Sequence, residues 1–523
     1  MKTQNQKKQY LYWGAGNFGK LCLKYYPDIK PICIIDQKAA DTELCGIPIK
    51  RPQKIKFTSD MFVVITVKSE EMIREIEGFL VDQGLKKGEN YCTYLEFFDV
   101  TKKNVGESLN DFEKKCFDKK DIILMVVPIL DVRNRTAFQK FIYQYVKDRK
   151  NQGKEVLIIS NIKVLSEKYA STLVGTEVFA HPEFDSKESG DVSGEDLEII
   201  RNIESRKAKV TGEEQKRHIN IFKYYENLFS MIRPQKVIMW GSWIVENYII
   251  EALAKKNGIK YGYMEHGWLP GTYQVDPKGI MGQSEYAGTS EISVDENIRM
   301  DKYNVQEIKQ FIASSQIDTR IFVETEEDEN ALSHIRRGQK TVFLVGMDDY
   351  GMQMNPNSWY WDRYISSNVK SSEDALEKLM SICKRNKWNL VYKPHPGNPI
   401  SSWVEECEDV VLVRECSVDR LIRLADVVVS VESAVDFKTL IYEKPLVQLG
   451  LNAIVGKQCS YVVSDIEDLE PQIKLAMKQG HTEAQKHNFE DLVQILLQKY
   501  LWDDLTEREV HYGLLTGRDF VDG

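Results

Sequence analysis

The chain has 523 residues, of which 42% are hydrophobic and 28% are charged, and its net charge is −9 at neutral pH. A chain of this length is too long for one hydrophobic core, so we expect three domains. The negative charge argues against a protein that holds a nucleic-acid backbone over a wide surface, but it leaves room for one small basic pocket.

The cysteines and the apolar segments indicate the compartment. Nine cysteines are scattered without CxxC spacing, which indicates reduced thiols rather than a disulfide or zinc framework, and hence a cytoplasmic protein. No apolar run approaches the roughly 20 residues that a membrane span requires. The apolar segment after the basic N-terminus is too short and too rich in glycine for a signal peptide.

Strand and helix patterns alternate along the chain, which predicts an α/β protein with parallel sheets covered on both faces. We expect a small first unit over residues 1–105, a second over 115–300, and a third over 335–523 that ends in closing helices. Residues 183–216 are acidic and rich in Ser and Gly, so we expect a mobile loop or an exposed helix there.

The first unit carries a glycine motif between a predicted strand and a predicted helix. Gly14, Gly16 and Gly19 have the G-x-G-x-x-G spacing, and Asp36 ends the next strand. In a dinucleotide-binding fold such glycines admit a pyrophosphate, and the acid binds ribose hydroxyls. The motif therefore predicts a bound nucleotide or NAD. The alternative is a tight turn in a small Rossmann-like accessory domain.

The second unit offers two carboxylates and an imidazole. A predicted strand over 260–265 ends in Glu265 and is followed by His266, and Asp276 comes later, before Pro277. We expect both carboxylates at the top of the sheet, facing the third unit across a cleft. A carboxylate there can deprotonate a hydroxyl or stabilise an oxocarbenium-like centre. The alternatives are a hydrogen-bonded Glu265–His266 pair that shapes the loop and, for Asp276, a turn residue.

The third unit contains a basic turn bounded by prolines. A buried strand over 389–393 ends in Lys393, and His395 and Pro396 follow. Lys393 and His395 share a face if the segment is extended, because side chains alternate along a strand. An imidazole and an ammonium group at the carboxyl end of a parallel strand suit a phosphate. The alternative is a strand end capped by a hydrogen-bonded His395.

Another strand of the third unit ends in polar residues. Ser430, Glu432 and Ser433 lie where a buried strand that begins at residue 426 gives way, near Ser433, to a helix over 434–442. The hydroxyls can bind phosphate or ribose, and Glu432 can accept from ribose hydroxyls. Ser433 is also the expected N-cap of the helix, and the alternative reading of the serines is capping alone.

A loop with two glycines follows the first strand of the third unit and is expected to face the same cleft. Gly346 leaves room for a phosphate or a sugar, and the Asp348 carboxylate can accept from sugar hydroxyls. We therefore expect one mononucleotide to bind at this sheet edge, between His395 and the segment around Ser430.

Several segments between residues 230 and 460 share a pattern with a known family. They are Glu265–Pro270, Asp276 with Gly279, Val345–Asp349, Tyr392–Pro396, Ser430–Phe437, Lys444 with Pro445, and Gly450. With these segments the chain resembles the capsule polysaccharide biosynthesis family, which includes bacterial Kdo transferases that use CMP-Kdo. The resemblance implies a GT-B-like pair of Rossmann-type domains, here preceded by the small Rossmann-like unit. It also implies that His395, Ser430 and Ser433 bind CMP and that Glu265 or Asp276 acts in catalysis.

The resemblance leads us to expect a glycosyltransferase of capsule or lipopolysaccharide synthesis. It would move a sugar from a CMP-linked donor to a glycan or lipid-linked acceptor. The transfer itself is expected to need no metal or other cofactor, because CMP carries one phosphate that Lys, His and a helix dipole can neutralise. Peripheral contact with membrane-bound assembly machinery at the inner face of the plasma membrane would fit this role.

Two other functions stay open. Asp436 and Phe437, together with the Lys-Pro-His-Pro turn, also resemble CDP-polyol phosphotransferases of teichoic-acid synthesis. The run Leu449–Ile454 departs from the aromatic- and glycine-rich run that capsule-family members commonly show, which leaves the donor open between a CMP-sugar and a CDP-polyol. A non-catalytic nucleotide-binding scaffold is the third function. The first unit lies outside the resemblance and is similar to small Rossmann-like domains attached to surface-polysaccharide enzymes.

Overall fold

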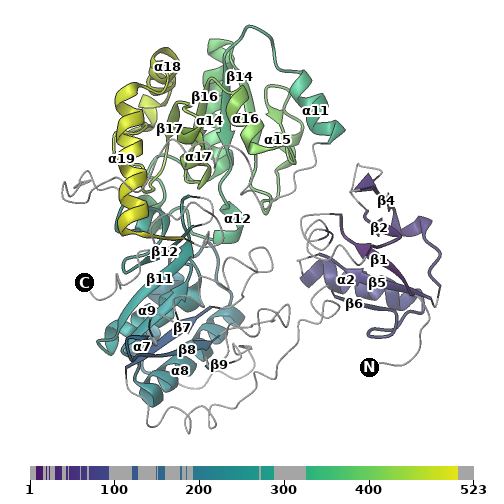
Figure 1. Ribbon diagram of the computed structural model, residues 1–523, viewed down its shortest axis with the longest axis vertical. Coiled ribbons are helices and arrows are strands. Elements are labelled where there is room, and N and C mark those ends of the chain that lie inside the picture. Colours follow the sequence, from purple (N-terminus) through teal and green to yellow (C-terminus); the bar gives the residue numbers. More distant parts are fainter. Residues whose placement is uncertain are drawn as a thin grey trace.

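The structure is a computed structural model. It describes residues 8–15, 30–37, 43–67 except 45 and 59, 70–93, 121–127, 151–159, 177–179, 192–269, 272–287 and 325–503, and also residues 19, 23, 146, 149 and 184. These residues form three β-sheets with helices packed against them (Figure 1). Within this described part of the chain, no helix is both long and apolar enough to cross a membrane.

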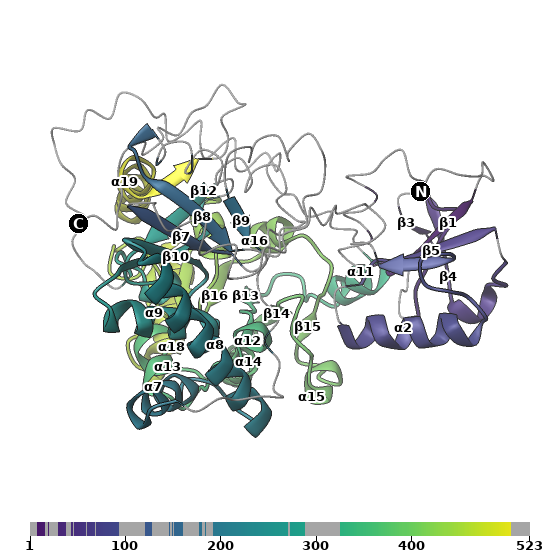
Figure 2. The same ribbon diagram turned by 90° about the horizontal axis from the view of Figure 1, so that it is seen from below.

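The first sheet has a Rossmann-like strand order. Its strands are β1 (Gln9–Trp13), β2 (Cys33–Ile35), β3 (Glu43–Leu44), β4 (Ile47–Lys50), β5 (Met61–Ile65) and β6 (Tyr91–Thr93), in the spatial order β3-β4-β2-β1-β5-β6. β1 pairs in parallel with β2 on one side and β5 on the other. The strand order therefore reverses at β1, the position where α/β sheets bind ligands. Helix α2 (Glu70–Asp82) runs along one face of the sheet (Figure 2).

The second sheet is mainly parallel. Its strands are β7 (Ile122–Val126), β8 (Glu155–Ile159), β9 (Glu177–Phe179), β10 (Lys236–Trp240), β11 (Lys260–His266), β12 (Thr272–Asp276) and β19 (Leu501–Asp503), in the order β19-β12-β11-β10-β7-β8-β9. All five residues of β7 are buried and apolar, as expected of a strand covered on both faces. β12 turns back antiparallel to β11.

In the described part of the chain, the second sheet is covered by α7 (Gly194–Glu204), α8 (Gly212–Ile232) and α9 (Val245–Lys256). α7 lies within the acidic segment predicted as a loop or an exposed helix, and Ser193 caps it by accepting from the Asp196 N–H. α8 begins with a capping box between Thr211 and Glu214. Its buried side chains pack on the strands through residues such as Phe222 and Tyr225.

The third sheet is parallel in all its described pairings. Its strands are β13 (Thr341–Val345), β14 (Asn389–Lys393), β15 (Val411–Leu412), β16 (Val427–Ser430), β17 (Leu446–Gln448) and β18 (Tyr461–Val462), in the order β15-β14-β13-β16-β17-β18. Its helices are α11 (Glu326–Ser333), α12 (Asp349–Met352), α13 (Trp359–Tyr364), α14 (Ser372–Asn386), α15 (Ser402–Glu405), α16 (Val418–Leu424), α17 (Val435–Ile441), α18 (Leu469–Gln479) and α19 (Glu483–Lys499). The central strand β13 has β14 and β16 as neighbours.

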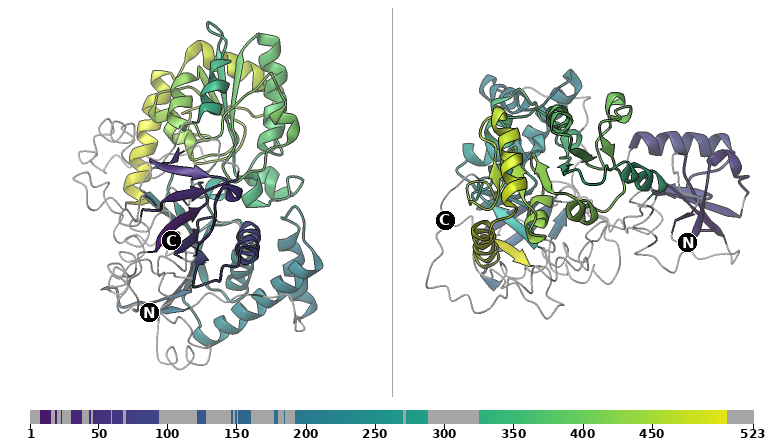
Figure 3. Two further views of the ribbon diagram at one scale, coloured as in Figure 1. Left: turned by 90° about the vertical axis from the view of Figure 1, so that its right-hand side faces the viewer. Right: turned by 90° about the horizontal axis from the view of Figure 1, so that it is seen from above.

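The chain returns from the third unit to the second at its C-terminal end. α19 runs along the side of the third unit toward the second (Figures 1 and 3). After it, β19 pairs antiparallel with β12, so that Tyr273 faces Trp502 in the ladder. The second sheet is therefore completed by residues more than 220 positions away in sequence.

The second and third sheets meet through the loops at the carboxyl ends of their parallel strands. The loop after β11 contacts α17, which follows β16. Lys207, between α7 and α8, joins the loop after β10 to α12, which follows β13, because it donates to a carbonyl of each. A mainly parallel sheet and a parallel sheet that face each other in this way, preceded by a Rossmann-like unit, confirm the predicted fold class. The boundaries of the three predicted domains stay predictions.

Candidate functional site

An aromatic stack joins the second unit to the third at the carboxyl end of β11. The Trp268 ring lies nearly parallel to the rings of Phe437 in α17 and Tyr500 after α19, with centroids 5.7 and 5.2 Å away. Trp268 is buried in this stack. Because Trp268 comes two residues after the end of β11, which carries Glu265 and His266, the stack ties these two residues to the third unit.

A second contact joins the loop before α8 to the segment after β13. The Lys207 ammonium group donates to the Trp243 carbonyl at 2.6 Å and to the Met352 carbonyl at 2.8 Å. The neighbouring Ala208 N–H donates to the Gln353 carbonyl. Burial lowers the pKa of Lys207 to about 8. The carbonyls stabilise its charged form, so this contact is strongest below that pH.

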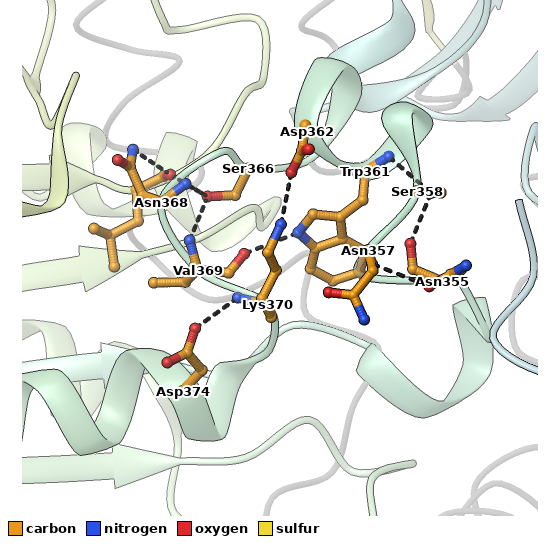
Figure 4. A network of polar contacts seen from close by, with 11 residues as sticks. Asn355, Asn357, Ser358, Trp361, Asp362, Ser366, Asn368, Val369, Lys370 and Asp374 are labelled. Carbon is orange, nitrogen blue, oxygen red and sulfur yellow. Dashed lines mark hydrogen bonds and ion pairs between the residues drawn. The ribbon is translucent and has the colours of Figure 1, made fainter.

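The segment between α12 and α14 is held by its own polar network (Figure 4). Ser358 caps α13 by accepting from the Trp361 N–H at 3.2 Å, and the Trp361 indole donates to the Val369 carbonyl at 2.8 Å. From the same helix, the Tyr360 hydroxyl donates to the Gln283 side chain of the second unit at 2.7 Å. These hydrogen bonds therefore fix α13 and its contact with the second unit.

At the carboxyl edge of the third sheet, an imidazole lies beside a carboxylate. His395 Nδ1 is 3.4 Å from Asp348 Oδ1, and the two side chains are 39% and 41% exposed. His395 comes from the turn after β14, and Asp348 from the loop after the adjacent strand β13. The structure thus brings together two residues that the sequence placed in one binding site.

Gly346 allows these two loops to approach each other. A Cβ at this position would lie 2.8 Å from the His395 nitrogen and 2.8 Å from the Pro394 Cα. Both are backbone atoms that have no room to move aside. The predicted space at Gly346 is therefore filled by the neighbouring turn, and the glycine serves the packing of the two loops.

At the end of β16, the polar side chains lie in the interior. Ser430, Glu432 and Asp436 are all buried. Asp436 accepts from the Asn452 amide at 2.6 Å, and Glu432 accepts from the backbone N–H of Gly282 in the second unit. Burial raises the pKa of Glu432 to about 8 and that of Asp436 to about 7. At neutral pH Glu432 is therefore mostly a neutral carboxylic acid in the contact between the units.

The remaining predicted donor residues differ in their exposure. Lys393 is buried, and its ammonium group donates to the Arg414 carbonyl after β15. Pro396 is exposed in the turn. Ser433 is half-buried and accepts from the Val435 N–H at 3.2 Å. Ala434, not Ser433, occupies the N-cap position of α17, so the predicted cap is wrong by one residue.

On the second sheet, Glu265 and His266 lie half-buried at the end of β11. Glu265 Oε1 accepts from the His266 N–H at 2.9 Å, and a Cβ built on Gly241, at the end of the adjacent strand, would lie 3.8 Å from Oε2. The His266 ring contacts Trp240 and Tyr273 at centroid distances of 5.1 and 5.4 Å. Glu265 is thus a partly exposed carboxylate at the sheet edge that faces the third unit.

Asp276 has a different environment. Its side chain is fully buried and accepts from three backbone N–H groups, those of Lys278, Gly279 and Glu285, and from the Tyr500 hydroxyl at 2.6 Å. Burial raises its pKa to about 6. These contacts close the loop after β12 at both ends, which favours the structural alternative for Asp276.

In the first unit, the glycine motif forms a close turn. Gly14 has φ of +125°, and a Cβ at Gly19 would lie 2.0 Å from the Gly14 carbonyl oxygen. Asp36 accepts from the Ala15 N–H at 2.8 Å. Gly16 lies outside the described residues. These contacts account for Gly14, Gly19 and Asp36 as turn residues, and the predicted nucleotide or NAD stays a prediction.

Two residues that the sequence analysis did not identify, Asn398 and Tyr500, hold the loops of the site in place by hydrogen bonds. Asn398 donates to the Met347 carbonyl at 2.8 Å and to Asp349 at 3.1 Å, which joins the two loops of the third sheet edge. Tyr500 reaches Asp276 from the far end of the chain. Within the described ranges, no group of three His, Cys, Asp or Glu side chains is arranged to hold a metal ion.

Comparisons with known proteins found a partial likeness to solved structures and no sequence match. No family model and no curated protein sequence matches the chain. Among solved structures, the β-Kdo 2,7-transferase of KpsC from Thermosulfurimonas dismutans has a TM-score of 0.31 at 19% identity, covering 54% of this chain and 82% of that one. The UDP-GlcNAc 2-epimerase of Methanocaldococcus jannaschii, bound to UDP-GlcNAc and UDP, has a TM-score of 0.30 at 10% identity, covering 72% and 98%. Because these TM-scores are low, we base the functional proposal on the chain's own residues.

Proposed function

We propose that the protein is a glycosyltransferase of bacterial surface polysaccharide synthesis. It transfers a sugar from a nucleotide donor, CMP-linked and Kdo-like, to a glycan or lipid-linked acceptor. The proposal rests on two pairs of half-exposed polar residues, one pair at each of the two sheet edges that face each other. His395 and Asp348 lie at the edge of the third sheet, and Glu265 and His266 at that of the second. Open parallel sheets bind their ligands at such edges.

On the donor side, His395 suits a phosphate oxygen. When the ring is neutral, Nδ1 accepts from the Gly397 N–H at 3.3 Å, which puts the ring hydrogen on Nε2. When the ring is protonated, Asp348 pairs with Nδ1–H, and Nε2 still carries a hydrogen. In both states Nε2–H can donate to the donor's phosphate, and the bond is stronger in the charged state. His395 thereby stabilises the charge that develops on the departing CMP.

On the acceptor side, Glu265 is the proposed general base. It is partly exposed at the edge that faces the third unit, whereas Asp276 is fully buried. A base must reach the acceptor hydroxyl within about 3 Å or through one water. Glu265 can meet that requirement, and the His266 N–H orients its carboxylate. The contacts of Trp268 with Phe437 and Tyr500 keep the end of β11 against the donor side.

A binding titration followed by a turnover assay tests the proposal. We expect CMP to bind the third unit and raise the melting temperature, and we expect no such binding there by UMP, UDP or NAD. At 100 times its dissociation constant, CMP should add about 2.7 kcal/mol to the free energy of unfolding. His395→Ala should remove the CMP effect. His487→Ala is the matched control, because this exposed histidine also lies beside an aspartate, at 3.6 Å.

The products then identify the reaction. We expect a CMP-sugar to yield CMP and a glycosylated acceptor, with much slower turnover for Glu265→Gln than for the wild type. Turnover of CDP-glycerol or CDP-ribitol in place of the CMP-sugar would replace the proposal with a polyol-phosphate transferase. Polymer assembly that continues unharmed with His395→Ala would point to a non-catalytic scaffold.

A further inference from the structure

The two loops that carry Asp348 and His395 are also joined by the side chain of Asn398. Its Nδ2 donates to the Met347 carbonyl at 2.8 Å and to Asp349 Oδ2 at 3.1 Å. Its Oδ1 accepts from the Tyr350 N–H at 3.1 Å. One amide therefore contacts Met347 in the loop after β13 and Asp349 and Tyr350 at the start of α12, while its own backbone belongs to the turn after β14.

The same loop is also attached to the start of α14. The Ser372 N–H donates to both carboxylate oxygens of Asp349 at 3.1 Å, and the Ser372 hydroxyl accepts from the Met347 N–H at 2.9 Å. Within the turn after β14, the Asn398 N–H donates to the His395 carbonyl at 2.9 Å. The α14 end, the Asp348 loop and the His395 turn are thus one hydrogen-bonded body.

This body carries an exposed aromatic ring. The Tyr350 side chain is 61% exposed although its backbone N–H is held by Asn398. A large ring on a fixed backbone loses little conformational entropy when a planar ligand stacks on it. Tyr350 lies in α12, two residues after Asp348, and Asp348 lies beside His395.

We propose that Asn398 is a positioning residue of the donor site, which fixes the phosphate-facing His395–Asp348 pair and the exposed Tyr350 ring as one surface for a nucleotide. This inference rests on the proposed function and deepens it. Asn398 itself contacts protein groups and does no chemistry. Its role is to fix the distance between the His395 imidazole, which donates to the phosphate, and the Tyr350 ring, on which the base stacks. A loop that was free to move would not keep this distance constant.

Two variants of Asn398 separate positioning from simple loss of structure. Asn398→Ala removes all three side-chain hydrogen bonds. Asn398→Asp keeps the shape and the acceptor for the Tyr350 N–H, but it places a second carboxylate beside Asp349. The other titratable groups that face Asp349 are Asp348, Glu373 and the Tyr392 phenol, and both variants leave them in place.

Calorimetric titration with CMP between pH 5 and pH 8, for the wild type and both variants, tests the inference. We expect Asn398→Ala to weaken CMP binding at least tenfold at every pH. Asn398→Asp should weaken it as strongly at pH 8, where the two carboxylates repel each other. It should approach wild-type affinity near pH 5, where they share a proton and the proton restores one hydrogen bond. Asn386→Ala, at the other end of α14, removes an amide that also makes two hydrogen bonds and should change nothing.

The outcomes separate the inference from the proposed function. If the wild type binds CMP and both Asn398 variants bind it equally well, the inference is overturned and the proposed function stands. If Asn398→Asp loses affinity without any recovery toward acidic pH, Asn398 is structural only and the inference is again overturned. If the wild type binds no nucleotide at the His395 site, the proposed function fails and the inference fails with it.

Discussion

The buried Glu432 provides a sharp test of how the second and third units meet. Its carboxyl group accepts from the Gly282 N–H across the interface, and burial raises its pKa to about 8. An unfolded glutamate has a pKa of about 4.3. Between these two values the folded protein holds one proton more than the unfolded chain. The free energy of unfolding should therefore fall as pH rises, by about 1.4 kcal/mol per pH unit from this group alone.

Glu432→Gln removes this dependence while keeping the shape of the side chain. At pH 5 the variant and the wild type should have similar stability, and at pH 8 the variant should be the more stable by several kcal/mol. The slope difference between pH 6 and pH 7 should be about 1.4 kcal/mol. Urea denaturation at each pH, with Glu377→Gln of the exposed face of α14 as the control, measures it. Parallel pH profiles for the wild type and Glu432→Gln would show that Glu432 is solvated and that the units do not meet as described.

Three further perturbations test other parts of the structure. Asp276→Asn should lower the free energy of unfolding by about 2 kcal/mol, because the new NH₂ group would face N–H and O–H donors that now point at the carboxylate. The kcat of this variant should stay within tenfold of the wild type, and a thousandfold loss of kcat at unchanged stability would restore a catalytic role for Asp276. Gly282→Ala should lower the melting temperature, because its Cβ would lie 1.8 Å from the Tyr364 carbonyl, whereas Gly212→Ala has open space and should not. Turnover should continue in excess EDTA, because the proposed CMP leaving group carries one phosphate; full loss that Mg²⁺ restores would contradict this.

Much of the fold could be read from the sequence because buried parallel strands are runs of apolar residues. The segments 122–126, 341–345 and 427–430 are such runs, and each is a central strand. The positions of His395 and Asp348 followed from the same reasoning, since both come just after neighbouring strands. Local chemistry and strand order were enough to bring them together.

The environment of Asp276 could not be predicted in this way. Its burial depends on Tyr500, which is 224 residues away and arrives only because β19 adds to the second sheet. Ser430 is likewise buried by packing between elements that no local pattern connects. The role of Asn398 could not be predicted either, because an asparagine two residues after a proline is typical of an ordinary turn. Long-range contacts decided each of these outcomes.

The most direct measurement of the central claim is a crystal structure of the protein with CMP bound. We expect the phosphate within about 3 Å of the His395 imidazole, with the nucleotide against Tyr350 at the carboxyl edge of the third sheet. A CMP molecule held elsewhere, for example only at the glycine turn around Gly14 in the first unit, would contradict it.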